Sequence, residues 1–302
     1  MRRAALAVAA AAAACGAGSR NTTAFDGETA LRYVREQVAF GPRVPNTEGH
    51  RRTGDWIEAH LRRTADSVEV QAWTHVSARG DSLRLRNFIG RFRPEATERI
   101  LLLAHWDTRP RADQEANLGA QQQPIPGAND GASGVAVLLG VADVLAATPP
   151  TLGVDLLFVD GEDWGTDFSG PDALIGSRYY AANLPRNRHP LFAVLFDMVG
   201  DADLRLYPEA NSVAGAPEVV NRVWETARSL GYDDVFRTDG QTSATDDHIP
   251  LLEAGVRAID VIDFAYGAPD RNVYWHTLQD TPDKVSARSL KIVGDVAVKL
   301  VT

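Results

Sequence analysis

The chain has 302 residues, of which 44% are hydrophobic and 24% charged, values typical of an ordinary globular protein. Its formal net charge is −9 and no basic stripe runs along it, which argues against nucleic acid as a partner. It contains 1 cysteine, so no intramolecular disulfide is possible and any metal site must use carboxylates and imidazoles.

The first residues have the pattern of an export signal. Arg2 and Arg3 precede a small apolar stretch, Ala4–Ala14, which is too short to span a bilayer as a permanent helix. Residues 1–14 are therefore predicted to be a signal peptide.

The residue that follows this signal is the cysteine. Cys15 comes after two alanines and before a glycine, which resembles a bacterial lipobox. We expect an exported protein, periplasmic or extracellular, that contacts a membrane only through a lipid on Cys15; soluble export is the alternative. Residues 15–27 are predicted to be a polar tether, and 28–302 a single folded domain.

Apolar periodicity defines the elements before residue 130. In order, they are helices over 29–40 and 49–63, an alternating pair of strands over 68–76 and 83–92, and a short buried strand over 100–104. The long connection 108–127 lacks periodicity, which is typical of a functional or mobile loop.

Helices and strands alternate in the rest of the chain. The predicted helices cover 135–147, 179–184, 217–230 and 286–301, and the predicted strands begin at 154 and cover 191–196, 204–207 and 256–264. This alternation predicts an α/β fold with a mostly parallel central sheet and helices on both faces, and the early pair adds antiparallel edge strands.

Acids and histidines recur where predicted strands end or helices begin. Each alone is ordinary, because a lone histidine is commonly structural and an aspartate before a helix is commonly a cap. Together they fall at the edge where parallel strands finish, so we expect them to converge. Oxygen and nitrogen ligands without thiolate suit zinc or, less specifically, manganese or cobalt. The residues are His105, Asp107, Asp130, Glu162, Asp163, Asp197 and His276.

Five motifs in order carry a family resemblance. They are HWD at 105–107, GANDGASG at 127–134, DGED at 160–163, FDMVG at 196–200 and WHT at 275–277. This set resembles the zinc aminopeptidase family, which includes bacterial leucyl aminopeptidases and glutamate carboxypeptidase. Within that family, DDHIPLL at 246–252 and the tryptophan before His276 look most like glutaminyl cyclases, which share the peptidase fold.

The resemblance implies a ligand set. Asp130, Asp163 and His276 resemble the ligands of a metal, with Asp130 bridging two metals in the peptidases. His105 and Asp197 resemble the ligands of the second peptidase metal. The implied cofactor is Zn²⁺, one ion in a cyclase and two in an aminopeptidase.

The resemblance also implies catalytic roles. Glu162 resembles the general acid/base, and Asp246 resembles the cyclase aspartate that hydrogen-bonds the residue matching Asp197. Asp107 resembles the acid that orients His105, as metal-bound histidines generally need. The candidate catalytic residues are therefore Glu162, Asp197 and Asp246.

One position departs from the family pattern. Both subfamilies commonly have two glutamates where this chain has Glu162 and Asp163. Aspartate is one methylene shorter, so either the metal sits closer to this strand or Glu162 is the ligand.

Tryptophans flank several of these residues. Trp275 resembles a wall of the cyclase substrate pocket, and Trp106 and Trp164 also adjoin candidate site residues. They are predicted to form a dry substrate wall, with ordinary core packing as the alternative.

The preferred hypothesis is a zinc-dependent glutaminyl-peptide cyclotransferase that converts the N-terminal glutamine of peptides to pyroglutamate and releases ammonia. The alternative is a zinc metallo-aminopeptidase that hydrolyses N-terminal residues from peptides. A non-catalytic binding module on the same fold predicts loss of the acid/base, and Glu162 is present. In either enzyme, peptide N-termini are the substrate.

Overall fold

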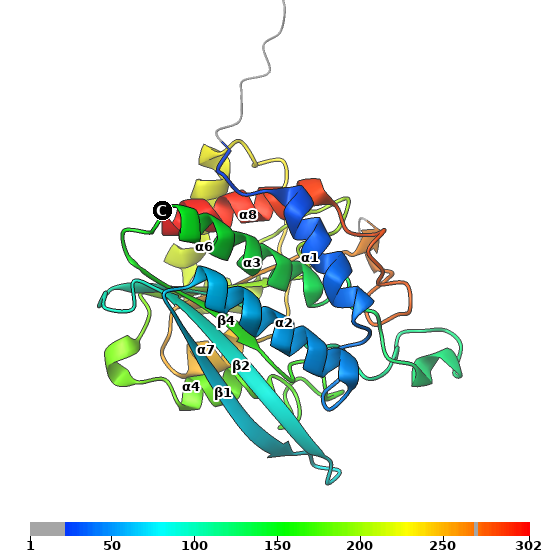
Figure 1. Cartoon of the computed structure of the whole chain (residues 1–302). Coiled ribbons are helices and arrows are strands. Elements are labelled where there is room, and N and C mark those ends of the chain that lie inside the picture. The colour runs from blue at the N-terminus through cyan, green and yellow to red at the C-terminus, as the bar shows by residue number, and fades with distance from the viewer. Residues whose placement is uncertain (1–21, 269–270) are drawn as a thin grey trace, which may run out of the picture.

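A six-stranded β-sheet runs through the middle of the molecule, with helices packed on both faces (Figure 1). The computed structural model describes residues 22–268 and 271–302. In chain order, the strands of the sheet are β1 (Ser67–Val76), β2 (Ser82–Phe92), β3 (Arg99–His105), β4 (Gly153–Val159), β5 (Phe192–Asp197) and β6 (Ala258–Ile262). A separate small ribbon consists of β7 (Gly267–Ala268) and β8 (Arg271–Asn272).

The order across the sheet is β1-β2-β4-β3-β5-β6. β3 pairs in parallel with β4 and β5, and β5 pairs in parallel with β6. β2 is antiparallel to both β1 and β4. Every residue of β3 to β6 is buried, which explains why these strands are nearly unbroken apolar runs. The predicted α/β fold with antiparallel edge strands is confirmed.

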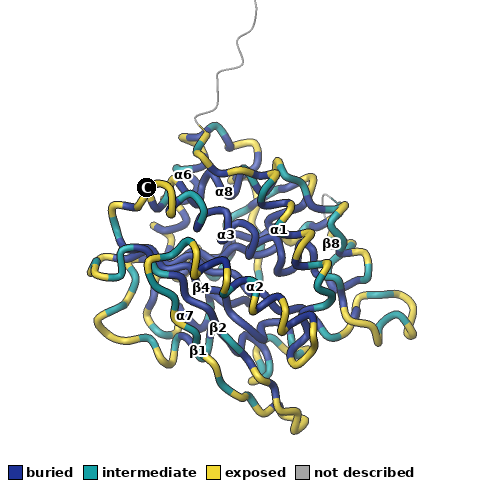
Figure 2. Tube along the Cα trace, in the orientation of Figure 1, coloured by how far each residue is buried: buried dark blue, intermediate teal, exposed yellow. Residues whose placement is uncertain are grey.

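The longer helices cover one face of the sheet. They are α1 (Gly27–Ala39), α2 (Glu48–Thr64), α3 (Ala132–Ala147), α6 (Pro217–Ser229) and α8 (Ala287–Val301). Leu102 and Leu156 of the sheet belong to the hydrophobic core on this side. Figure 2 shows the buried centre that these layers enclose.

Shorter helices lie against the opposite face. They are α4 (Ile175–Ala182), α5 (Ala210–Gly215) and α7 (His248–Glu253), with 3-10 turns η1 (Ala120–Gln122) and η2 (Arg186–Arg188) elsewhere. Tyr180 of α4 and Leu251 of α7 pack with Leu101 and Leu157, whose side chains point away from the first core. Alternate residues of the same strands thus serve the two cores.

Two predicted elements differ from the structure. Residues 204–207 form no strand, because only Leu206 pairs with another segment, in an isolated bridge to Phe236; Leu204 and Leu206 still pack into the core. The helix predicted over 179–184 is α4, which begins earlier, at Ile175, and ends at Ala182.

The predicted tether, residues 15–27, extends too far. Phe25 is 2% exposed and lies against the backbone of α3 and α8, where a Cβ on Gly140 would come 2.4 Å from its ring. Thr23 donates hydrogen bonds to Asp295 of α8 from its backbone N–H and its hydroxyl, at 3.0 and 2.6 Å. The folded part therefore includes residues from Thr23 onward.

The predicted signal peptide, residues 1–14, and the lipidation at Cys15 lie outside the described residues and stay predictions. Within residues 22–268 and 271–302, no helix combines the length and the apolar character needed to cross a membrane.

β1 and β2 form a long hairpin that projects from the body of the molecule (Figure 1). Its turn is held to the loop that follows β4, because the backbone N–H of Ala78 donates to Asp172 at 2.9 Å. His75 Nε2 lies 2.9 Å from the other oxygen of Asp172. The hairpin tip and the loop over 164–174 are thus one continuous surface.

Candidate metal centre and active site

Neighbouring strands bring the predicted site residues to one edge of the sheet. His105 is the last residue of β3 and Asp197 the last residue of β5. Glu162 and Asp163 come shortly after β4, and Asp130 lies just before α3. Because β3, β4 and β5 are parallel, their carboxyl ends share this edge.

Glycines allow the start of α3 to approach these strand ends. A Cβ on Gly134 would lie 2.1 Å from the carbonyl oxygen of Phe196 in β5. A Cβ on Gly131 would lie 2.7 Å from the ring of His105. The small residues around Asp130 are therefore required by close packing, which sets this aspartate beside the histidine.

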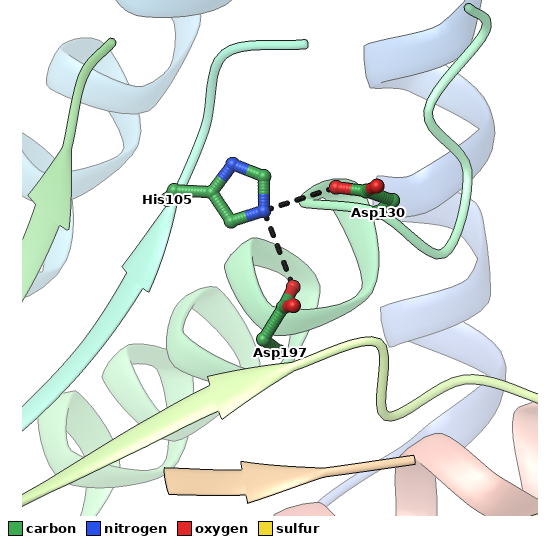
Figure 3. Close-up of side chains that lie close together, drawn as sticks. All are labelled: His105, Asp130 and Asp197. Atoms are coloured by element: carbon green, nitrogen blue, oxygen red, sulfur yellow. Dashed lines mark hydrogen bonds and ion pairs between the residues drawn. The ribbon is translucent and has the colours of Figure 1, made fainter. Parts of the chain in front are cut away.

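His105, Asp130 and Asp197 form the first ligand group (Figure 3). His105 Nε2 lies 3.2 Å from an oxygen of Asp130 and 3.2 Å from an oxygen of Asp197. All three residues are buried. The side chains come from β3, the start of α3 and β5, and they point toward one another.

Asp130, Asp163 and His276 form the second ligand group. His276 Nε2 lies 3.3 Å from an oxygen of Asp163 and 3.6 Å from the second oxygen of Asp130. Asp130 thus belongs to both groups and presents one oxygen to each. This geometry brings together the five side chains that the sequence proposed as metal ligands.

The donor set fits a metal ion. In each group the three candidate ligand atoms lie within 4.8 Å of one another, and all are carboxylate oxygens or imidazole nitrogens. Asp163 Oδ2 is buried without a hydrogen-bond partner among the described residues, although its neighbour Oδ1 is bonded. A cation at the second group would satisfy that oxygen.

Asp107 supports the loop that carries Glu162 and Asp163. One of its oxygens accepts the backbone N–H of Glu162 at 3.1 Å, and the other accepts that of Asp163 at 3.2 Å. It also lies 3.6 Å from His105 Nδ1. It therefore contacts the predicted partner, His105, but its hydrogen bonds are made with the loop after β4.

Asp280 and Arg43 hold the segment around Asp130, and sequence reasoning missed both. Asp280 accepts the backbone N–H groups of Asn129 and Asp130 at 2.8 and 3.1 Å. The buried guanidinium of Arg43 donates to the carbonyl oxygens of Trp106 and Asp130 at 3.1 and 3.3 Å. Two ligand-bearing segments are thus fixed to one arginine.

Arg109 and Asp113, in the connection 108–127, support the second ligand group and were also missed. Asp113 Oδ1 lies 3.1 Å from His276 Nδ1, the ring nitrogen that faces away from the group. Arg109 donates to Asp113 at 2.8 Å and to Asp163 Oδ1 at 2.7 Å. The loop packs behind His276, since Gln114 N also donates to the His276 carbonyl. The connection 108–127 has no periodicity that could have indicated these contacts, because they join residues far apart in the sequence.

Glu162 is a buried carboxylate beside the ligands. Its Oε2 lies 3.8 Å from His105 Nδ1. Burial raises the pKa of Glu162 well above its usual range; His105 opposes the shift, and the charges of Asp163 and Asp246 add to it. Burial, reinforced by the charge of Asp197, also raises the pKa of Asp246, to about 7.

A cavity of about 250 Å³ opens onto both ligand groups. Acids, apolar side chains, small polar residues and His276 line it. The acids are Asp130, Glu162, Asp197 and Asp246, and the walls are Phe168, Ser243, Ala244, Thr245, Ile262, Phe264 and Trp275. The predicted catalytic residues therefore share one cavity of a size that suits the end of a peptide.

The three predicted wall tryptophans occupy different places. Trp275 lines the cavity and stacks on His276, with ring centroids 3.7 Å apart. Trp164 lines an adjacent cavity. Trp106 is fully buried, stacked 4.3 Å from His50, and its Nε1 donates to a backbone carbonyl. The substrate-wall interpretation of Trp106 is wrong, because it packs in the core.

Two site residues have a left-handed backbone. His276 has a φ of 55°, and Met198, which follows Asp197, has a φ of 49°. Non-glycine residues adopt this conformation at a cost of about 1 kcal/mol or more, and it concentrates at functional sites. The left-handed conformation thus occurs at one candidate ligand, His276, and directly after another, Asp197.

Comparisons with known proteins agree with this geometry. Among solved structures, the chain is similar to a glutaminyl cyclase from Bacteroides thetaiotaomicron, with 37% identity and a TM-score of 0.87 over 93% of this chain and 99% of that one. It is equally similar to a leucine aminopeptidase precursor from the same species, with 36% identity and a TM-score of 0.87 over 93% and 98% of the two chains.

Sequence relatives give the same result. The aminopeptidase YwaD from Bacillus subtilis is 26% identical over 94% of this chain, and the chain spans 58% of that protein's length. The sequence profile of peptidase family M28 matches residues 87–301, which include every candidate ligand and the acid/base candidate. With that match over most of its length, the chain belongs to peptidase family M28.

Proposed function

We propose that the protein is a zinc-dependent glutaminyl-peptide cyclotransferase. The observation that carries the proposal is the setting of Glu162, a buried carboxylate at the end of a small cavity walled by Phe168, Phe264 and Trp275. Cyclisation requires that the substrate's own amine, rather than water, attacks, and apolar walls favour that outcome. The likeness to a bacterial glutaminyl cyclase supports the same activity.

Asp130, Asp163 and His276 would hold the zinc ion. They supply two carboxylates and one imidazole, a donor set that leaves room for substrate at a catalytic zinc. Bound there, zinc would supply a Lewis acid that polarises the side-chain carboxamide of the substrate.

Glu162 would move the proton. The α-amine nitrogen of the N-terminal glutamine forms a bond to the carboxamide carbon, and the bond from that carbon to the amide nitrogen breaks. Glu162 accepts the proton that the amine releases and returns it to the departing nitrogen, which leaves as ammonia. Asp197 and Asp246 line the same cavity and would accept hydrogen bonds from the reacting nitrogen atoms.

A metallo-aminopeptidase is the second candidate. Asp130 offers one oxygen to each ligand group, an arrangement that suits two ions. In that enzyme Glu162 would deprotonate a water molecule that attacks the first peptide bond. The likeness to a leucine aminopeptidase precursor supports this alternative.

Two substrates separate these activities. Purified zinc-loaded protein is offered glutaminyl-β-naphthylamide and leucyl-p-nitroanilide in parallel, and ammonia, pyroglutamate and p-nitroaniline are measured. We expect pyroglutamate and ammonia from the first substrate and no p-nitroaniline from the second. Release of p-nitroaniline without pyroglutamate would exclude the cyclase, and two zinc ions per chain would support the peptidase.

Glu162→Gln tests the proposed acid/base. The amide cannot accept the proton, so turnover should fall by about 10² to 10⁴ or more. Zinc content should stay at the wild-type value, because Glu162 belongs to neither ligand group. Retained turnover would assign the proton transfer to another residue, and lost zinc would make Glu162 a ligand.

A further inference from the structure

We infer that a second cavity, beside the first, binds an acidic residue of the peptide downstream of its N-terminal residue. The inference deepens the proposed function and rests on it. The cavity has a volume of about 360 Å³, within the range of ligand sites. It lies between the turn of the β1–β2 hairpin, the segment 109–113 and the loop over 164–172.

The two cavities are neighbours. Arg109 lines the second cavity and donates to Asp163, a candidate ligand at the first, at 2.7 Å, and to the carbonyl of Gly165 at 2.9 Å. Phe168 lines the first cavity, and its ring lies 5.6 Å from the Arg109 guanidinium carbon. A peptide that leaves the first cavity past Phe168 therefore reaches the second directly.

Two arginines at the second cavity make no direct hydrogen bond to a described carboxylate. Arg79, in the hairpin turn, and Arg111 are exposed, and neither makes a close ion pair with a described carboxylate, although the charge of Arg79 acts on Asp172 and helps to lower the pKa of that carboxyl. Arg109 differs, because Asp113 and Asp163 already compensate its charge. The lining also contains Asp81, Asp113, Asp167 and Asp172, so the two guanidinium groups themselves, rather than a net positive charge of the cavity, would hold a ligand carboxylate.

The carboxylates of the cavity, by contrast, are engaged with donors of the chain. Asp172 is bonded to His75 and Ala78, Asp113 to Arg109 and His276, Asp167 to Ser169, and Asp81 to Ser77. The guanidinium groups of Arg79 and Arg111 form no hydrogen bond among the described residues, so their N–H donors are available to a ligand. They match a carboxylate, which arginine binds through two parallel hydrogen bonds.

The test uses the zinc-loaded protein and amidated tetrapeptides that begin with Gln, in which Glu, Gln or Lys is placed in turn at positions two, three and four. KM and kcat are measured for the native protein, the double variant Arg79→Ala/Arg111→Ala, and Arg84→Ala. Arg84 is exposed on the same hairpin but does not line the cavity, so it is the matched control.

We expect KM to be about twofold to fivefold lower with Glu than with Gln at one position, as for exposed ion pairs. The double variant should lose this preference with kcat unchanged, and Arg84→Ala should keep it. The preference should weaken with added salt. Equal KM values for Glu, Gln and Lys peptides, or a preference that survives in the double variant, would overturn the inference.

A failure of the proposed function can be distinguished from a failure of the inference about the second cavity. If no Gln peptide is converted, the same series beginning with Leu is measured. Calorimetric titration of the same peptides into Glu162→Gln and into that variant carrying both arginine substitutions tests the cavity without turnover. We expect tighter binding of the Glu peptides to Glu162→Gln, and no such preference when both arginines are also replaced. Equal binding of the Glu, Gln and Lys peptides to Glu162→Gln contradicts the inference.

Discussion

At the scale of single residues, the second ligand group depends on Asp113 as much as on its own members. A carboxylate at the Nδ1 side of His276 fixes which ring nitrogen carries the proton, so that Nε2 stays free to bind a metal. Arg109 bonds both Asp113 and Asp163, and so couples the directions of two candidate ligands. A lysine at position 109 would lack the forked guanidinium group that lets Arg109 bond both carboxylates.

Asp113→Asn should weaken zinc binding about 10- to 100-fold, because His276 loses the charge that orients it. The measurement is a competition between the protein and a zinc chelator. Glu115→Gln is the control, since Glu115 lies on the same loop but accepts the backbone N–H of Leu278 at 2.9 Å. Native zinc affinity in Asp113→Asn would show that Asp113 does not position His276.

These residues also show what the sequence left hidden. His105, Asp130 and Asp197 were predictable because strand ends meet at one edge and the motifs keep a known order. Asp113 and Asp280 lie in segments without periodicity, and aspartate is common in such loops. Their contacts arise only when residues more than a hundred positions apart meet, and no local pattern encodes that.

Asp260 of β6 lies behind the site and has an unusual environment. It is fully buried, and neither carboxylate oxygen has a hydrogen-bond partner among the described residues. Burial raises its pKa well above the usual range, and the charges of Asp246, Asp197, Glu209 and Asp247 add to the shift. The folded protein therefore keeps this group protonated at a pH where the unfolded chain has released the proton.

Asp260→Asn should stabilise the protein, and by more at pH 8 than at pH 5. The carboxyl of Asp260 has a higher pKa in the folded protein than in the unfolded chain, so its contribution to stability is lost as the pH rises above the unfolded value of about 3.9 toward the folded value. The amide of asparagine does not titrate, so it escapes this loss. The gain at pH 8 should be about 1 kcal/mol or more, because keeping the folded carboxyl protonated costs about 1.4 kcal/mol for each pH unit above its unfolded pKa, and the amide avoids this cost. Urea unfolding of metal-free protein at each pH measures it.

Asp239→Asn is the control for that experiment, because Asp239 is exposed. It should change the free energy of unfolding by less than about 0.5 kcal/mol at either pH. A pH-independent effect of Asp260→Asn would mean that Asp260 is ionised in the folded protein.

At the scale of elements, the join between α3 and β5 sets the position of Asp130. Gly134 lies where the first turn of α3 touches the carbonyl of Phe196, so any side chain there must push the two elements apart. Helix propensity alone favours alanine over glycine by about 1 kcal/mol. Packing therefore opposes propensity at this position.

Gly134→Ala should destabilise the protein by about 2 to 3 kcal/mol, the usual cost of overpacking, and weaken zinc binding as Asp130 moves. Urea unfolding and zinc competition give the two values. Gly119→Ala is the control, since Gly119 is exposed with a φ of −70° that alanine adopts freely. Stabilisation by Gly134→Ala would show that α3 and β5 are not in close contact.

Element prediction succeeded where burial dictates the pattern. The inner strands were predictable because both of their faces are covered, which leaves an apolar run. Residues 204–207 alternate between apolar and polar side chains as an edge strand does, but they have no strand to pair with, and a single sequence contains no signal for that. The connection 108–127 was predicted to be functional or mobile, and its contacts with His276 support the functional alternative.

At the scale of the whole molecule, the amino-terminal segment closes the core. Phe25 is inserted between α3 and α8, and Thr23 is bonded to Asp295 in α8. The sequence suggested a polar tether here because threonine and aspartate surround one isolated aromatic residue. Only the assembled fold, with glycines on two helices facing that ring, shows why it is buried.

A chain that starts at Thr22 should unfold at the same urea concentration as the full chain, whereas one that starts at Gly27 should lose about 3 to 5 kcal/mol. The second chain lacks Phe25, and removing a buried phenylalanine side chain costs that much. Urea unfolding of the two proteins gives the comparison. Equal stability of the two chains would show that residues 22–26 belong to the tether, as predicted from the sequence.

The support that Asp280 gives to the backbone of Asp130 bears on biosynthesis. Asp280 and His276 are translated late, long after the strands that carry the other ligands have left the ribosome. A nascent or prematurely terminated polypeptide therefore lacks the second ligand group, which is completed only when His276 joins Asp130 and Asp163.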